Sequence, residues 1–245
     1  MATNVALHRK AYVGALALAG NTRDVGYSIM AAMQPATTYN DGGWECVKPG
    51  LKSGTITFDG FQDFAVASID DTIGVAGLGG QNVISVYENP SGSVTAGDHA
   101  RISRGVIESY EPITGAVGEM AGLTIGAKFD TVVPEALVLH PEAARTATGT
   151  GTAVAMTGPT SSQRLYAALH VVAWSGLTSL VVKVQSDDNS GFTSATDRLT
   201  FTTATGVTSE WSSVAGAFNT ETHMRVSYTI VGTGSVTFAL AAGVL

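Results

Sequence analysis

Five histidines are the side chains of this sequence best suited to acid–base or metal chemistry, because imidazole titrates near neutral pH and binds metal ions. They are scattered along the chain, and no two stand at the spacing of metal ligands. Two of them, His170 and His223, fall in one expected sheet region, which leaves a shared site open. Ordinary hydrogen-bonded positions on strand faces are the simpler interpretation. The full set is His8, His99, His140, His170 and His223.

Carboxylates occur as two adjacent pairs, Asp70-Asp71 and Asp187-Asp188. Neighbouring residues of a strand point to opposite faces, so neither pair can form a catalytic dyad there, although a turn could let one bind a cation. The best metal candidate is DDNSG (187–191), but it lacks the later acid of an EF-hand calcium loop. We expect instead a hairpin turn in which Asp and Asn side chains bond to the backbone.

No other residue completes a reaction centre. Cys46 has no histidine near it in sequence, and GLGG (77–80) lacks the strand, helix and acidic residue of a dinucleotide-binding fold. No side chains are placed for acid–base or nucleophilic work. We therefore expect no enzyme, no cofactor and no metal.

The composition favours an all-β protein with at most a minor helix. Charged residues make up only 13% of the 245 residues, about half the usual share, and glycine alone occupies 29 positions. Thr, Ser, Gly, Ala and Val take the place of charge, which suits short strands and tight turns. The net charge is −7, without any run of Lys or Arg, so conventional nucleic-acid binding is a poor interpretation. No apolar run is long enough for a membrane span.

The second half, residues 149–245, is expected to form an antiparallel β-sandwich. Half-apolar runs recur there at regular spacing and are separated by turn clusters. VGTG (231–234) is expected to join the last two strands as a hairpin loop. The expected strands are 164–174, 179–186, 197–203, 210–216, 223–230 and 235–245.

The first half, residues 1–148, is expected to be a separate β-domain. We place the join near Gly149, because TATGTGTAVAMTGPT (146–160) is uncharged and rich in Thr and Gly. A helix after Asp71 is the one helical candidate, although the segment is rich in glycine. The expected strands are 11–19, 54–61, 64–69, 83–88, 101–109, 121–129 and 136–140.

A long loop is expected over residues 37–53, which carry Gly, Pro and Trp44 with no clear period. An exposed tryptophan in such a loop usually packs against something, and a neighbouring chain can supply that surface. This loop is our candidate contact with an adjacent subunit. The candidate contact residues are Trp44, Pro49, Phe58 and Phe61.

Two stretches of the first half resemble the major tail tube proteins of long-tailed bacteriophages. One is TTYNDGGWECVKPGLKSGTITFDGFQDF (37–64), which ends in Gly60, Phe61, Gln62 and Asp63. The other is YEPITGAVGEMAGLTIGAKF (110–129). The second half is similar to accessory β-sandwich domains of phage virion proteins, through LHVVAWSG (169–176), VKVQSDDNSGF (182–192) and RVSYTIVGTGSVTFALAAGV (225–244).

The resemblance implies a structural virion protein of the siphovirus type. Tail tube proteins form hexameric rings whose joined sheets line a channel, and the rings stack to the length of the tail. Its partners would be further copies of itself, a tape measure protein and a tail terminator. DNA would pass through the lumen during ejection without specific binding, no membrane would be involved, and assembly would take place in the host cytoplasm. The accessory domain would face outward.

The charge distribution fits such a channel, because residues 1–145 carry 9 basic and 15 acidic residues, a net of −6. Acidic walls repel phosphates and let DNA slide. Two alternatives stay open. A capsid decoration protein would form trimers or monomers on a head lattice, and a carbohydrate-binding module would present Trp174 or Trp211 on its surface.

Overall fold

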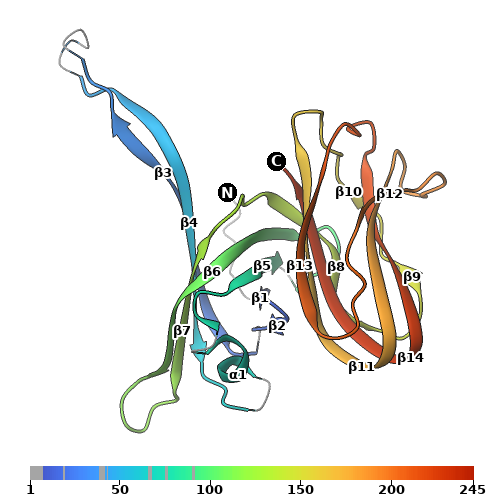
Figure 1. Cartoon of the computed structure of the whole chain (residues 1–245), viewed down its shortest axis with the longest axis horizontal. Helices are drawn as coiled ribbons and strands as arrows, with labels where there is room; N and C mark the ends of the chain where they lie inside the picture. The colour runs from blue at the N-terminus through green and yellow to red at the C-terminus, as the bar shows by residue number, and fades with distance from the viewer. Residues whose placement is uncertain are drawn as a thin grey trace. The chain divides into compact units, whose positions relative to one another are not determined.

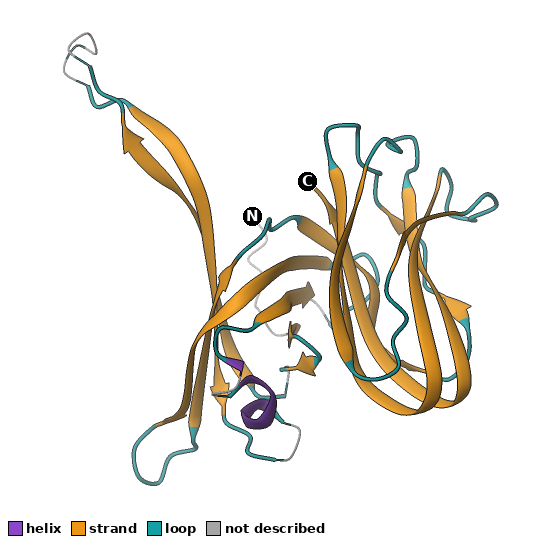
Figure 2. Ribbon diagram, viewed as in Figure 1, coloured by secondary structure: helices purple, strands orange, loops and turns teal. Residues whose placement is uncertain are grey.

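The computed structural model describes residues 8–18, 20–38, 42, 44–65, 68–74, 77–89 and 92–245. Almost every element is an antiparallel β-strand (Figure 2), which confirms the expected all-β class. The helix α1 (Ile69–Ile73) is the one α-helix in these residues. None of the helical structure described is long and apolar enough to cross a membrane.

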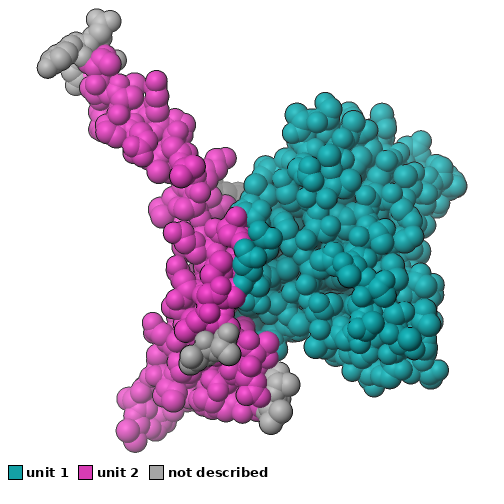
Figure 3. All heavy atoms as spheres, in the orientation of Figure 1, with its two compact units in different colours: residues 1–20, 81–104, 131–245 teal, residues 21–80, 105–130 magenta. Residues whose placement is uncertain are grey.

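The chain divides into two compact units, coloured separately in Figure 3. Unit 1 comprises residues 1–20, 81–104 and 131–245, and unit 2 comprises residues 21–80 and 105–130. The expected domain boundary between residues 148 and 149 falls inside unit 1, and it stays a prediction.

Unit 1 is organised around two long paired strands, β11 (Arg164–Asp187) and β14 (His223–Val244). Their pairing runs from Leu165 opposite Val244 to Asp187 opposite His223, with register shifts in the middle. Both halves of each strand contribute to one buried cluster, so the bent pair encloses its own core (Figure 1). Leu165, Leu180, Val226 and Leu240, for example, all belong to this cluster.

The expected hairpin loop at 231–234 is therefore wrong. Strand β14 continues through it, and β11 continues through Ser175 and Gly176 on the opposite side. Gly176, Gly232 and Gly234 all have positive φ, which lets both strands bend at the same level. Local turn residues marked this bend correctly, but long-range pairing turned the expected hairpin at 231–234 and the expected break after Trp174 into two continuous strands.

Shorter strands complete unit 1. β8 pairs with β14, β12 and β13 pair with β11, and β1 pairs with β2 and β5. The first part of β6 pairs with β8. The bounds are β1 (His8–Val13), β2 (Leu16–Ala17), β5 (Gln81–Asn89), β6 (His99–Thr114), β8 (Glu135–Arg145), β9 (Gly149–Thr150), β10 (Val154–Ala155), β12 (Thr196–Thr200) and β13 (Thr208–Ala215).

Unit 2 is built on a sheet of four antiparallel strands in the order β3-β4-β7-β6. The strands are β3 (Thr22–Pro35), β4 (Val47–Phe61), β7 (Gly122–Phe129) and the second part of β6. The sequence did not predict β3, because its apolar residues do not alternate with polar ones. The expected strand at 64–69 is wrong, since α1 begins at Ile69 and residues 64, 65 and 68 belong to no strand; residues 66 and 67 lie outside the described residues.

Two buried histidines of unit 1 are held in the neutral state by burial, and both ring nitrogens of each make a hydrogen bond. The ring nitrogens of His170 lie 2.7 Å from the carbonyl oxygen of Gly14 and 2.7 Å from the hydroxyl oxygen of Ser85. His140 accepts a hydrogen bond from Arg145 at Nε2, 3.1 Å away, and so donates from Nδ1 to the carbonyl oxygen of Phe238. Burial lowers the pKa of each histidine to about 4, and the charge of Arg145 adds to the effect at His140.

Unit 1 should therefore lose stability in mild acid. The folded pKa lies below the unfolded value near 6.5, so the unfolded chain binds more protons between about pH 4 and 6.5. The free energy of unfolding keeps its full value above this pH window. Within the window, each histidine lowers it by about 1.4 kcal/mol for every pH unit of acidification. Urea unfolding of wild type and His170→Gln at pH 7.5 and pH 5 tests this. If the free energy of unfolding depended on pH equally in the two proteins, His170 would not be the source of this acid sensitivity.

Candidate functional site

The described residues hold no group of three or more His, Cys, Asp or Glu side chains able to bind a metal ion. The strand register places His170 of β11 opposite Ala239 and His223 of β14 opposite Asp187, so these two histidines lie at different levels of the β11–β14 pair and do not share a site.

The DDNSG segment forms the expected backbone-capping turn. The carboxylate of Asp187 accepts hydrogen bonds from the amides of Asn189 and Ser194, at 3.1 and 2.8 Å. The side-chain oxygen of Asn189 accepts another from the amide of Gly191, at 2.9 Å. Burial raises the pKa of Asp187, but these hydrogen bonds outweigh it and lower the pKa below its ordinary value. The carboxylate is thus engaged by the turn itself.

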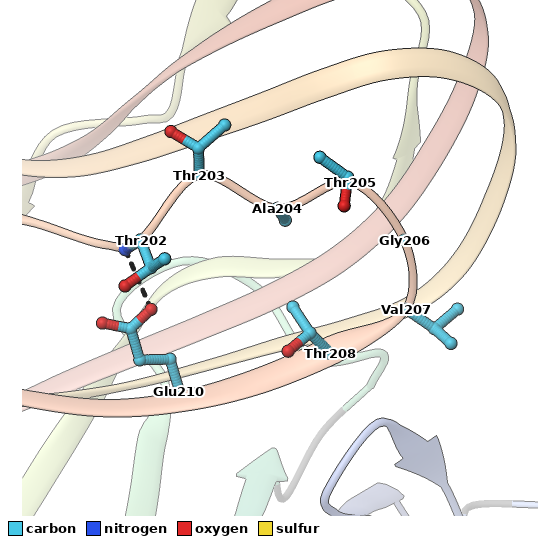
Figure 4. Close-up of a pocket in the computed structure, with 8 residues that line it drawn as sticks. All are labelled: Thr202, Thr203, Ala204, Thr205, Gly206, Val207, Thr208 and Glu210. Carbon is cyan, nitrogen blue, oxygen red and sulfur yellow. Dashed lines mark hydrogen bonds between the residues drawn. The ribbon is translucent and has the colours of Figure 1, made fainter.

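A hollow of about 290 Å³ in unit 1 lies beside the loop that precedes β13 (Figure 4). Threonines make up half of its lining residues, and the carboxylate of Glu210 accepts a hydrogen bond from the amide of Thr202. No aromatic ring lines it, so it lacks the flat apolar surface on which a sugar ring stacks.

The tryptophans of unit 1 pack against its core. Trp174 lies against the cluster between the halves of β11 and β14, and Trp211 lies against a second cluster that includes Tyr12. Trp211 also stacks on Tyr166, with 5.7 Å between ring centroids. Both tryptophans are thus partly buried, and neither is presented as a free platform.

Exposed apolar side chains are concentrated in unit 2, although it is the smaller unit. Four of the large ones belong to unit 1, and twelve belong to unit 2. Isolated exposed apolar residues are ordinary, but contiguous groups mark interaction surfaces. The twelve are Tyr27, Ile29, Met30, Met33, Trp44, Val47, Leu51, Phe64, Leu78, Ile113, Val117 and Met120.

A first group of these exposed residues lies on a two-stranded ribbon, which we call the arm (residues 29–35 and 47–53). Its members are Ile29, Met30, Met33, Val47 and Leu51. Strand β4 pairs with β7 only from Thr55 onward, so its earlier residues pair with β3 alone. The arm consequently extends beyond the other strands of unit 2 (Figure 1). Met33 is 61% exposed and Leu51 is 87% exposed, which leaves much apolar surface in water.

The second group lies at what we call the tip (residues 111–121), which ends β6 and leads into β7. Ile113, Val117 and Met120 are each more than two-thirds exposed. Gly115 and Gly118 have positive φ and shape the turn. The amide of Ala116 donates a hydrogen bond to the carboxylate of Glu119, 3.0 Å away.

One face of the four-stranded sheet is a dry core. Ile56 and Phe58 of β4 lie opposite Ala127 and Ile125 of β7, and all four are almost fully buried. Helix α1 is tied to this side of the sheet by the hydroxyl of Tyr110, which donates to the carboxylate of Asp70 at 2.7 Å. Burial, with this hydrogen bond, raises the pKa of Tyr110 to about 12.

The opposite face is polar and carries a row of polar side chains across the four strands, with a carboxylate on three of them. Asp24 lies opposite Asp59, Asp59 opposite Thr124, and Thr124 opposite Glu111. Residues directly opposite one another share a face, so the row is continuous. The hydroxyl of Thr124 donates to the carboxylate of Asp59 at 2.6 Å. Lys128, opposite Thr55, is a cation on the same face.

The outer edge of the sheet is unpaired in the described chain. Among the described residues β3 pairs with β4 alone, so no other strand of this chain lies along its outer side. At 14 residues β3 is long for an edge strand. Such an edge readily pairs with another chain.

The structure separates the four expected contact residues. Trp44 is 82% exposed beside the arm, and Pro49 lies in the arm opposite Met33. Phe61 is at the other end of β4, and Phe58 is 1% exposed in the core, so we leave Phe58 out of any contact surface. The expected loop 37–53 is shorter than predicted, because β4 begins at Val47. Sequence reasoning missed Ile29, Met30 and Met33, and the run of apolar residues in IMAAM was the available signal.

No family model and no curated protein matches the sequence. Solved structures that are similar to the chain include "Virion of native gene transfer agent (GTA) particle", with 18% identity and a TM-score of 0.36 over 47% of this chain and 84% of that one. The tail of an empty GTA particle, solved with C6 symmetry, has 17% identity and a TM-score of 0.35. The match covers 47% of this chain and 81% of that one. The Dit protein of phage SPP1, described as a hub of the adsorption apparatus, has 11% identity and a TM-score of 0.35. The match covers 97% of this chain and 99% of that one. Scores of this size do not establish a common fold, so we argue function from the strands and side chains above.

Proposed function

We propose that this chain is a structural virion protein that assembles into stacked hexameric rings and so forms a phage tail tube. The observation that carries the proposal is the four-stranded sheet of unit 2, with its long unpaired edge at β3 and its uncovered apolar arm. The sequence resemblance to major tail tube proteins supports it independently. Neither feature suits a chain that works alone.

Ring formation follows from the edges of this sheet. A neighbouring strand that pairs with the outer side of β3 would continue the sheet. Such a contact joins one edge of a copy to a different edge of the next, so it is heterologous and closes into a ring when the rotation allows. The number of six subunits comes from the resemblance to tail tube proteins.

The polar face of the sheet suits the wall of a DNA channel. The row through Asp24, Asp59 and Glu111 would be repeated in every subunit and form a band of negative charge. Negative walls repel the phosphates of DNA, which can then slide without being held. The dry face would point away from the lumen.

The resemblance supplies the rest of the proposal. A tape measure protein would occupy the lumen before DNA, a tail terminator would cap the last ring, and assembly would precede virion release in the host cytoplasm. Capsid decoration is the competing structural role, and it predicts trimers or monomers in place of rings. A carbohydrate-binding module is less well supported, because Trp174 and Trp211 both pack against the core.

Assembly of the purified chain tests the proposed function. We expect light scattering after gel filtration and negative-stain microscopy to show rings, and hollow tubes at high concentration. Trp44→Ala should slow tube growth roughly tenfold, because a large exposed aromatic is typical of an interface anchor. Val207→Ala, a change at an exposed residue of unit 1, is the matched control and should have no effect. Dispersed monomers or trimers at every concentration would contradict the proposal.

The lumen assignment has its own test. Asp24→Lys should slow or trap DNA during ejection, because it places a cation in the acidic row of every subunit. Asp24→Asn is the control: it removes charge without adding attraction, and its side-chain oxygen can still accept the hydrogen bond from Val25. Virions with normal tails and an unchanged ejection rate for Asp24→Lys would show that this face does not line the channel.

A further inference from the structure

We propose that the arm of one copy binds the tip of a second copy, and that this contact stacks one ring on the next. The inference rests on the proposed function and names the partner surface of the arm. The arm and the tip both belong to unit 2.

The arm and the tip lie at opposite ends of one sheet. Val47, at the arm, begins β4, and Phe61 ends it fourteen residues later. Strand β7 runs antiparallel to β4, with Gly122 opposite Phe61, so the tip that precedes Gly122 lies at the far end from the arm. A contact between the two therefore joins unlike ends of neighbouring molecules.

Both ends leave apolar surface uncovered. Ile29, Met33 and Val47 lie on one face of the arm, and they are 48%, 61% and 47% exposed. At the tip Val117 and Met120 are still more exposed. Burying apolar area contributes about 25 cal/mol per Å², so each end gains by covering the other.

The two ends carry opposite charge. The arm contains Lys48 and Lys52 and no carboxylate, and both lysines are exposed. The tip contains Glu111 and Glu119 and no cation, and both acids are exposed. No residue in the described parts of the chain forms an ion pair with either lysine or either glutamate. Like ends therefore repel and unlike ends attract, which selects one orientation.

The tip also offers a hollow for a side chain. A depression of about 160 Å³ lies where β4 and β7 meet the tip. Phe61 and Met120 give it apolar walls, and Asp59 and Glu119 add two carboxylates against one cation, Arg23. An apolar stem that ends in an ammonium group fits such a lining, and Lys48 or Lys52 supplies one. Phe61 thus enters the contact on the tip side, whereas Trp44 and Pro49 lie on the arm side.

The geometry of this contact predicts what it builds. Because it joins unlike ends along the strand direction, it is heterologous and repeats without closing. Pairing at β3 adds neighbours sideways. The two contacts are therefore independent, one making the ring and the other the stack, and each can be broken separately.

Charge reversal tests the inference. We would prepare an arm-reversed chain, Lys48→Glu with Lys52→Glu, and a tip-reversed chain, Glu111→Lys with Glu119→Lys. Each alone presents like charges at both ends and should give rings whose stacking is at least tenfold slower than wild type. When preformed rings of the two kinds are mixed, every arm again meets a tip of opposite charge. Tubes should then grow from the mixture, as seen by turbidity and negative-stain microscopy.

Controls separate folding and net charge from contact. Glu119→Gln keeps an acceptor for the amide of Ala116 and should stack better than the tip-reversed chain. Arg164→Glu with Lys183→Glu changes the net charge of the chain by the same amount as the arm-reversed chain, but in unit 1, and it should stack normally. Normal tubes from either reversed chain, or a mixture that stays as rings while wild type stacks, would overturn the inference. A wild type that forms no rings would instead overturn the proposed function.

Discussion

An unpaired β-edge next to uncovered apolar surface is the constraint on which this protein depends. The outer side of β3 has no partner strand in the described chain, and the part of β3 that belongs to the arm carries exposed Ile29, Met30 and Met33. Soluble proteins usually protect such edges with charge, proline or a covering element. Here the described chain offers no cover, so the edge is best understood as half of an interface.

The two faces of the same sheet differ in character: one is apolar and buried, and the other is polar and carries carboxylates. The dry face anchors the strands through Ile56, Phe58 and Ile125, and so holds the register that aligns the carboxylates on the opposite face. A one-residue slip would exchange these faces and bury Asp59. The dry core and the acidic polar face are therefore both consequences of one pairing pattern.

The sequence predicted what alternation and turn residues encode. Strands such as β5 and β7, the capping turn at Asp187 and the all-β class were confirmed. What failed depended on distant partners: β3 has no alternating pattern and exists because it pairs with β4, and VGTG bends a strand because β11 bends beside it. The apolar arm escaped notice for the same reason, since residues 47–53 resemble a loop until their partner strand is known.

Hydrogen exchange at β3 tests the central claim most directly. Peptides that cover residues 22–35 would be followed by mass spectrometry in the dispersed chain and in the assembled particle, with β7 peptides as an internal reference already paired on both sides. Completion of the edge by a like copy predicts strong slowing of exchange in β3 upon assembly, and little change in β7. Equal exchange of β3 in both states would contradict the account.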